Sequence, residues 1–292
     1  EDIIVNGEVK ISAGTIVDTV TTANNGADSK ELYLGKYKIV ERQSPMGYLC
    51  SNKEKIITIA SEGQNTPVVE VKVEFENDYQ STQIDIAKKA EIIMSEENDG
   101  TVSTKINVTA GKGFVFGLYT DEDIYAADRR TMISKDSLVA FEKTDENGKL
   151  SFLGKYPHGK YYVKEIYINS AYERNDTKYP VDLSYNKELD RIYIDMTASP
   201  ILNKIIQVPM TITKYDITGR QTVPGTMIEV YDEDGNIIYK NITNEDGKIS
   251  DILVEKGHSY TFKEVLSAEG YALNTAVFRF EVTDNGEIVG DT

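Results

Sequence analysis

Two kinds of residue recur in this sequence at positions where their side chains could do chemistry. Glu41, Glu165 and Glu264 each follow a tyrosine by four positions and precede another tyrosine by seven. Lys88 and Lys214 each end a stretch of alternating apolar and polar residues, so a strand would place both lysines on its apolar face. Burial disfavours charge: it lowers the pKa of a lysine and raises the pKa of a glutamate. A buried pair of this kind supplies an amine nucleophile and a proton donor.

Both kinds of residue also have a plainer interpretation. A lysine in phase with isoleucines often runs along an apolar surface with its ammonium in water. Glutamate is seldom buried unless it is paired. The recurrence of both lysines and the shared register of the three glutamates favour the reactive interpretation over coincidence.

The other reactive residue types form no convincing site. His158 and His258 lie beside turn glycines without companions for a triad or a metal centre, and we interpret them as surface residues. Cys50 has no partner histidine, so we interpret it as a structural thiol and not as a nucleophile. The acidic segments 232–235 and 244–247 lack the ligand pattern of a calcium loop, so we predict hairpin turns there, no metal site and no cofactor.

The elements that must position these residues are short strands. Residues 68–75, 191–196 and 276–282 alternate β-branched or aromatic residues with polar ones, which is typical of half-buried strands. Asn-Gly and Asp-Gly pairs between such segments supply the positive φ angles of tight turns. We interpret residues 94–104 as a solvated turn or loop, and no long helical period competes with the strands. The sequence therefore predicts an all-β fold.

Composition limits the function classes. The chain has 292 residues, of which 40% are hydrophobic, enough for two or three domains with their own cores. Its formal net charge of −16 disfavours nucleic acid and anionic lipid as partners. No apolar run reaches the length of a membrane span and no leader sequence opens the chain, so we expect this segment to make no membrane contact. A single cysteine excludes an internal disulfide, so a secreted protein of this sequence would need another source of stability.

Internal repetition divides the chain into three repeats. The shared set is a Tyr, a Glu four residues later and a second Tyr seven residues after that, as Tyr37, Glu41 and Tyr48; Tyr161, Glu165 and Tyr172; and Tyr260, Glu264 and Tyr271. In addition, Glu1-Asp2-Ile3 matches Glu122-Asp123-Ile124. We expect a first repeat at 1–79, a middle repeat at 80–205 and a third repeat at 206–292.

These residues resemble a known family, the B-type repeat domains of collagen adhesins and the SpaA-like domains of Gram-positive pilins. The resemblance rests on Gly-Lys-Tyr-Tyr-Val-Lys-Glu at 159–165, Tyr-Thr-Phe-Lys-Glu-Val at 260–265 and Phe-Val-Phe-Gly-Leu-Tyr at 114–119, and it covers essentially the whole chain. It implies tandem prealbumin-like, or immunoglobulin-like, β-sandwich domains. It also implies an isopeptide bond between a lysine on the first strand and an Asn or Asp on the last, promoted by a Glu on the opposing sheet.

Carried over residue by residue, the family pattern is complete only in the middle repeat. Ile84, Ile86 and Lys88 share one strand face, which would place Lys88 in the core. Glu165 stands at the promoter position and Asn203 at the acceptor position. The resemblance therefore implies a Lys88–Asn203 amide, formed with release of ammonia. We expect the protonated Glu165 to donate a hydrogen bond to the carboxamide oxygen of Asn203.

Each outer repeat lacks one partner of this set. The first repeat contains Glu41 and Asn77, but its lysine strand would lie before the chain begins. The third repeat contains Lys214 and Glu264, but its acceptor strand would lie beyond the chain's last residue. We expect these four residues to be unlinked, and the first and third repeats to lack their N-terminal and C-terminal strands respectively. The open sheet edges should make both outer repeats less stable than the middle one.

Two function classes follow. The favoured one is the stalk or shaft of an extracellular adhesin or pilin, anchored to a Gram-positive cell wall by segments outside this sequence. Its partners would be neighbouring domains of the same surface protein, and it would be no enzyme apart from forming its own cross-link. The alternative is a module that itself binds a host matrix protein or polysaccharide, which requires an exposed apolar patch or a groove. A hydrolase is least favoured, because no Ser-His-Asp or metal constellation is present.

Overall fold

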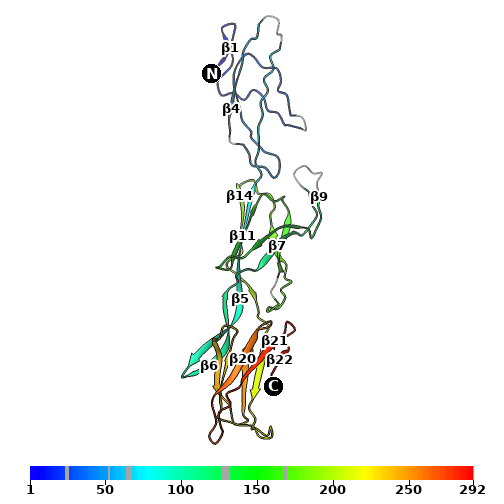
Figure 1. Ribbon diagram of the computed structural model, residues 1–292. Coiled ribbons are helices and arrows are strands. Elements are labelled where there is room, and N and C mark those ends of the chain that lie inside the picture. The colour runs from blue at the N-terminus through cyan, green and yellow to red at the C-terminus, as the bar shows by residue number, and fades with distance from the viewer. Residues whose placement is uncertain (24–25, 52, 64–67, 126–131, 168–169, 292) are drawn as a thin grey trace. The chain divides into compact units, whose positions relative to one another are not determined.

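The computed structural model describes residues 1–23, 26–51, 53–63, 68–125, 132–167 and 170–291 (Figure 1). These residues form strands and no helix, so the all-β prediction is confirmed. The chain divides into two compact units. The first comprises residues 1–81 with 185–191, and the second comprises 82–184 with 192–292.

The first unit contains the first repeat, and its described residues form two antiparallel strand pairs. β1 (Ile3–Val5) pairs with β2 (Glu8–Ile11), and β3 (Gly35–Ile39) pairs with β4 (Lys55–Ile59), both antiparallel. Among the described residues of this repeat, the buried hydrophobic side chains are those of Ile3 and Tyr37. Few buried apolar groups stabilise this repeat, and its lower stability relative to the middle repeat stays a prediction.

The predicted strand at 68–75 is wrong, because none of the described residues in this segment belongs to a strand. A strand needs a neighbour for its backbone N–H and C=O groups. The matching part of the middle repeat is β14 (Arg191–Asp195) and β15 (Ile201–Asn203), which both pair with the long strand β5 (Ser81–Asn98). The described part of the first unit offers no counterpart of β5 to residues 68–75.

The middle repeat is a two-layer sandwich. Its remaining strands are β6 (Thr101–Ala110), β7 (Val115–Thr120), β8 (Ile124–Tyr125), β9 (Met132–Ile133), β10 (Leu138–Lys143), β11 (Lys149–Gly154), β12 (Lys160–Tyr167) and β13 (Tyr179–Asp182). One sheet has the order β10-β7-β12-β13, and in the other β5 pairs with β11, β14 and β15. Residues from both sheets form one buried core, including Ile86, Phe152, Phe116 and Val163. The two sheets therefore enclose the core between them.

The third repeat is a second sandwich with its own core. Its strands are β16 (Val208–Thr213), β17 (Met227–Tyr231), β18 (Ile237–Ile242), β19 (Lys248–Val254), β20 (Ser259–Leu266), β21 (Val277–Val282) and β22 (Ile288–Gly290). β16 pairs with β19, and the other strands have the order β18-β17-β20-β21-β22. The predicted strands at 191–196 and 276–282 are confirmed as β14 and β21, apart from single residues at their ends.

The predicted turn or loop at 94–104 is confirmed only at residues 99–100 and is wrong for the rest, which form the outer half of a long hairpin between β5 and β6. Residues 91–98 of β5 pair in register with 101–108 of β6. Asp99 and Gly100 close the hairpin with φ angles of 47° and 78°, as a two-residue turn of this type requires. The polar sequence misled the prediction because this part of the hairpin carries mostly exposed side chains.

The two acidic segments predicted as hairpin turns have different outcomes. Residues 232–235 form a hairpin turn between the paired strands β17 and β18, with Gly235 at a φ of 82°. In 244–247, Gly247 N donates to Asn244 O at 2.8 Å, which closes a tight turn. That turn leads from β18 to β19, which lie in different sheets, so it is a connection between layers and not a hairpin.

Candidate functional site: a buried Lys-Glu-Asn cluster

Lys88 lies in the core of the middle repeat. Along β5, Ile84, Ile86 and Lys88 are buried and Lys89 is exposed, as the alternation of the sequence predicted. The Lys88 side chain is among the largest fully buried ones in the chain, with 1% of the residue exposed. Burial lowers the pKa of Lys88 to about 8, and the nearby negative charge of Glu165 opposes this effect only in part.

Three groups surround the Lys88 ammonium nitrogen. Nζ donates hydrogen bonds to the carbonyl oxygens of Lys89, at 2.6 Å, and Ile201, at 3.2 Å. It also lies 4.3 Å from the centre of the Phe114 ring. The aromatic face stabilises the charged form but also keeps water away from it. This leaves the amine held in one place by backbone oxygens and an aromatic ring.

Glu165 and Asn203 meet from opposite sheets. Glu165 is on β12 and Asn203 on β15, and both are buried, with 6% and 1% exposed. Asn203 Nδ2 donates a hydrogen bond to Glu165 Oε1 at 2.8 Å. Burial raises the pKa of Glu165, while the hydrogen bond from Asn203 and the charge of Lys88 act in the other direction.

Lys88 and Asn203 are neighbours on one face of a parallel strand pair. β15 pairs parallel with β5, so that Ile201 lies opposite Lys88 and Asn203 lies opposite Ala90. Lys88 and Ala90 are both buried, which places Asn203 diagonally across from Lys88 on the same face. A lysine side chain is long enough to reach a diagonal neighbour. The structure thus brings Lys88, Glu165 and Asn203 together.

The orientation of the Asn203 carboxamide differs from our expectation. We expected its oxygen to accept a hydrogen bond from a protonated Glu165, but its nitrogen donates to Glu165 Oε1. An ionised carboxylate only accepts hydrogen bonds, so the observed orientation is the one that a charged Glu165 requires. Asn203 Oδ1 and Glu165 Oε2 are both buried without a hydrogen-bond partner among the described residues. If Glu165 held a proton and the Asn203 carboxamide turned by half a turn, Glu165 would donate a hydrogen bond to Asn203 Oδ1.

The first repeat has the same Glu-Asn pair. Asn77 Nδ2 lies 2.8 Å and 2.7 Å from the two carboxylate oxygens of Glu41, and 2.9 Å from Leu49 O. Glu41 is half-buried and follows β3 instead of lying within it. The surrounding backbone also matches, because Leu49 N donates to Asp78 O as Glu173 N donates to Lys204 O.

The third repeat has a lysine and a glutamate in contact. Lys214 Nζ lies 3.2 Å from Glu264 Oε2 in an ion pair, with 24% of the Lys214 side chain and 5% of the Glu264 side chain exposed. The contact lacks the direction of a hydrogen bond, so Glu264 Oε2 is a buried oxygen without a hydrogen-bond donor among the described residues. Because 24% of its side chain is exposed, Lys214 is more accessible to water than Lys88, of which 1% is exposed.

Sequence reasoning missed that Phe114, beside Lys88, is replaced by Thr226 at the equivalent position near Lys214. Phe114 N donates to Thr144 Oγ1 at 2.9 Å, and in the third repeat Thr226 N donates to Thr243 Oγ1 at 3.0 Å. Thr226 therefore stands where Phe114 stands in the middle repeat. It is fully buried, and its Oγ1 has no hydrogen-bond partner among the described residues. The repeated glycine and threonine around each position were the signal that could have revealed the equivalence.

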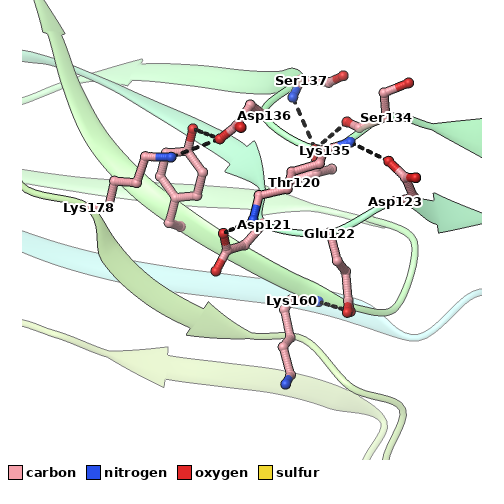
Figure 2. Close-up of polar contacts among 11 residues, drawn as sticks. Thr120, Asp121, Glu122, Asp123, Ser134, Lys135, Asp136, Ser137, Lys160 and Lys178 are labelled. Atoms are coloured by element: carbon pink, nitrogen blue, oxygen red, sulfur yellow. Dashed lines mark hydrogen bonds and ion pairs between the residues drawn. The ribbon is translucent and has the colours of Figure 1, made fainter.

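The matched Glu-Asp-Ile segments have one structural role. Figure 2 shows Glu122 Oε1 accepting a hydrogen bond from Lys160 N, at 2.9 Å, and Asp123 Oδ1 accepting one from Lys135 N, at 2.8 Å. In the first repeat Asp2 Oδ1 accepts from Ala13 N at 2.7 Å. In the middle repeat the Glu122 contact holds the first residue of β12, the strand that carries Glu165, and the Asp123 contact holds the segment that follows β9.

The remaining candidate residues lie outside this cluster. His158 is half-buried at the surface, with Nδ1 3.0 Å from Leu183 O. His258 is exposed. Cys50 is exposed and its Sγ donates to Glu41 O at 3.5 Å, while desolvation and Glu41 raise the pKa of its thiol, the opposite of nucleophile activation.

Neither a metal centre nor a membrane helix occurs in the part of the chain that the structure describes. No three or more His, Cys, Asp or Glu side chains are grouped there so that they could hold a metal ion. No helix there has the length and apolar character needed to cross a membrane.

The fold and the recurring site define a protein made of tandem prealbumin-like β-sandwiches. The family model of the SpaA prealbumin-like fold domain matches residues 4–79, 99–197 and 208–292. The chain therefore belongs to the SpaA family of prealbumin-like fold domains, and the predicted family is confirmed.

Solved structures with similarity to the chain include pilins and the TIE protein. The TIE protein of Bacillus anthracis is 25% identical, with a TM-score of 0.59 over 91% of this chain and 43% of that one. The shaft pilin spaA of Lactobacillus rhamnosus GG is 14% identical, with a TM-score of 0.29 over 70% of this chain and 94% of that one. A streptococcal ancillary pilin is 17% identical, with a TM-score of 0.31 over 90% and 74%. A search of curated proteins finds no significant match.

Proposed function

We propose that this chain forms part of the stalk of a cell-wall-anchored adhesin or pilin on a Gram-positive bacterium. Its three repeats, 1–79, 80–205 and 206–292, would serve as spacers that contact neighbouring domains of the same surface protein. Membership of the SpaA domain family supports this proposal. The chain spans 43% of the length of the TIE structure.

We further propose that the middle repeat forms an isopeptide bond between Lys88 and Asn203. The neutral amine of Lys88 attacks Cγ of Asn203, and the protonated Glu165 donates a hydrogen bond to Oδ1, which polarises the carbonyl. The new bond joins Nζ to Cγ, and the bond from Cγ to Nδ2 breaks. A proton passes from Nζ to Nδ2 through Glu165, so that ammonia leaves and Glu165 returns to its starting state. No cofactor takes part in these steps.

The observation that carries this proposal is the burial of all three groups in one core. Lys88, Glu165 and Asn203 come from three strands, β5, β12 and β15, and the fold holds them in one core. Reactants fixed in one core avoid the entropic cost of a bimolecular encounter. Intramolecular reactions between well-oriented groups reach effective molarities of roughly 10⁵ M or more. The pKa of Lys88 is lowered and that of Glu165 is raised, which favours the neutral forms that the reaction needs.

The cross-link would also supply the stability that disulfides give to other secreted proteins. It closes nearly the whole middle repeat into one covalent loop, for which the chain-entropy treatment of disulfides gives about 4 to 5 kcal/mol. Peptide mapping tests the bond directly. A protease digest of the folded protein should contain a branched peptide that joins the Lys88 and Asn203 segments, and recovery of both segments only as linear peptides would refute the proposal.

A further inference from the structure

The hairpin of β5 and β6 occupies a position where the third repeat has only a short turn. Gly111 N donates to Lys88 O at 2.9 Å, and Val223 N donates to Lys214 O at the same distance. In both repeats, therefore, the segment after the lysine ends at a residue whose backbone N–H donates to the carbonyl oxygen of that lysine. The third repeat closes this gap with eight residues, whereas the middle repeat uses residues 89–110. The extra length forms the outer part of the hairpin.

This outer part contacts the edge of the third repeat. Val102 of β6 pairs antiparallel with Lys240 of β18, so a continuous sheet runs from the middle repeat into the third. Thr104 Oγ1 accepts a hydrogen bond from Leu253 N, at 2.8 Å. Leu253 is on β19, which belongs to the other sheet of the third sandwich. The hairpin thus bridges both layers at this edge.

Burial along β6 agrees with that docking. Val102 and Thr104 are two residues apart and share one face of the strand, whereas Ser103 and Lys105 point the other way. Val102 is 9% exposed although it lies two residues from the hairpin turn, and Ser103 and Lys105 are exposed. One face of the hairpin tip therefore packs against the third repeat.

The base of the hairpin fixes the segment that joins the two repeats. Glu91 Oε2 accepts a hydrogen bond from Ile205 N at 3.0 Å, and Ile205 is 4% exposed. This segment begins directly after Asn203, and the hairpin begins directly after Lys88. The middle repeat is therefore joined to the third by two connections that start from the neighbouring strands β5 and β15.

We propose that the hairpin is a coupling element that binds the edge strand β18 of the third repeat and makes the middle and third repeats unfold as one unit. The partner surface is the backbone edge of β18 at Lys240, where Val102 of β6 pairs with it. An uncovered edge strand invites pairing with other chains, so the hairpin also protects the third repeat from association. This inference goes beyond the stalk function and holds whether or not Lys88 is cross-linked.

A loop exchange that uses the equivalent, shorter segment of the third repeat tests the coupling. Residues 89–110 are replaced by residues 215–222, which close the equivalent gap in the third repeat. A point variant, Val102→Asp, places a charge on the buried face of the hairpin. Val108→Asp is the matched control, because Val108 is on the same strand and 46% exposed.

Hydrogen exchange of residues 237–242 is the measurement. We expect amide exchange in β18 to accelerate about tenfold or more in both variants, as local opening becomes easier, and to stay unchanged in the control. Thermal unfolding of the middle and third repeats should change from one transition to two. Unchanged β18 protection in both variants would overturn the proposal. Intact mass reports the Lys88–Asn203 bond separately, so failure of one proposal is not mistaken for failure of the other.

Discussion

Asn203 and Glu165 meet across the core of the middle repeat, where Asn203 Nδ2 donates a 2.8 Å hydrogen bond to Glu165 Oε1. The same contact joins Asn77 to Glu41 in the first repeat, where no β5-like strand is described. The Glu-Asn pair is thus set by the strand and loop that carry it and does not depend on the lysine. The proposed promoter and acceptor are thus paired by hydrogen bonds in both repeats.

Removal of the promoter carboxyl should abolish the bond. Glu165→Ala cannot polarise the Asn203 carbonyl or carry the proton, so we expect the variant to keep the full mass computed from its sequence. Without the covalent loop, its free energy of unfolding should fall by about 4 to 5 kcal/mol, plus the loss of packing. Intact mass and denaturant titration measure the two effects.

Glu264→Ala is the control for this variant, because Glu264 has the same position in the third repeat. It should leave the ammonia loss of the middle repeat unchanged. A cross-linked Glu165→Ala protein would show that Glu165 is not the promoter.

Stability should depend on pH through Lys88 when the bond cannot form. In Asn203→Ala, Lys88 stays free with a folded-state pKa of about 8, below an unfolded-state value of about 10.4. Below pH 8 both states hold the proton, and the full cost of the buried charge is present. Between about pH 8 and 10.4 the unfolded state binds more protons, so the free energy of unfolding should rise with pH.

Denaturant titrations across this pH window test the effect. Lys88→Met in the Asn203→Ala background is the control and should remove the rise. A stability that falls or stays flat between pH 8 and 10.4 in Asn203→Ala alone would contradict a lowered Lys88 pKa.

The Phe114 ring should control the rate of bond formation. Phe114→Thr copies Thr226 and opens the core around Lys88, so the amine becomes better hydrated and keeps its proton. We expect slower cross-linking after refolding at neutral pH, partly restored at higher pH, and a loss of about 3 to 5 kcal/mol from the missing core side chain.

A mass time course after refolding gives the rate. Phe141→Thr is a matched control, because Phe141 is 66% exposed on β10. If Phe114→Thr formed the bond as fast as the unaltered protein at neutral pH, the ring would have no part in activating Lys88.

Gly159 should be intolerant of a side chain because Ile124 packs against it. A Cβ at position 159 would lie 2.7 Å from Ile124 Cδ1, where the backbone φ is +155°. Gly159→Ala should therefore destabilise the middle repeat by about 1 to 3 kcal/mol. If the contact is the cause, the double variant with Ile124→Ala should lose less free energy of unfolding than the two single variants lose together. A loss in the double variant equal to or larger than that sum would rule out the contact as the cause.

Local patterns in the sequence predicted the features that depend on one strand alone. Alternation along 83–89 placed Lys88 in the core and Lys89 outside, because side-chain direction in a strand follows from position. The same pattern failed at 68–75, because strand formation also requires a partner, which is a property of the whole fold. Repetition at fixed spacing predicted the three repeats, and the resemblance of their motifs to known domains predicted the family.

Features that depend on contacts between distant segments could not be read from the sequence. The polar residues of 94–104 looked like a loop because the surface that covers part of them lies more than a hundred residues later, in β18 and β19. The glycine and threonine near Phe114 and Thr226 hint at their equivalence, and the hydrogen bond that each backbone N–H donates to a threonine Oγ1 establishes it. The carboxamide orientation of Asn203 depends on whether Glu165 holds a proton, which no sequence pattern encodes.

The intact mass of the folded 1–292 polypeptide tests the central claim most directly. The account predicts a mass lower than that computed from the sequence by one ammonia, because Lys88 and Asn203 are joined while Lys214, Glu264, Glu41 and Asn77 stay unlinked. The measurement needs no label and is made on the unaltered chain. A mass equal to the computed one would contradict the cross-link, and a loss of more than one ammonia would contradict the assignment of a single reactive repeat.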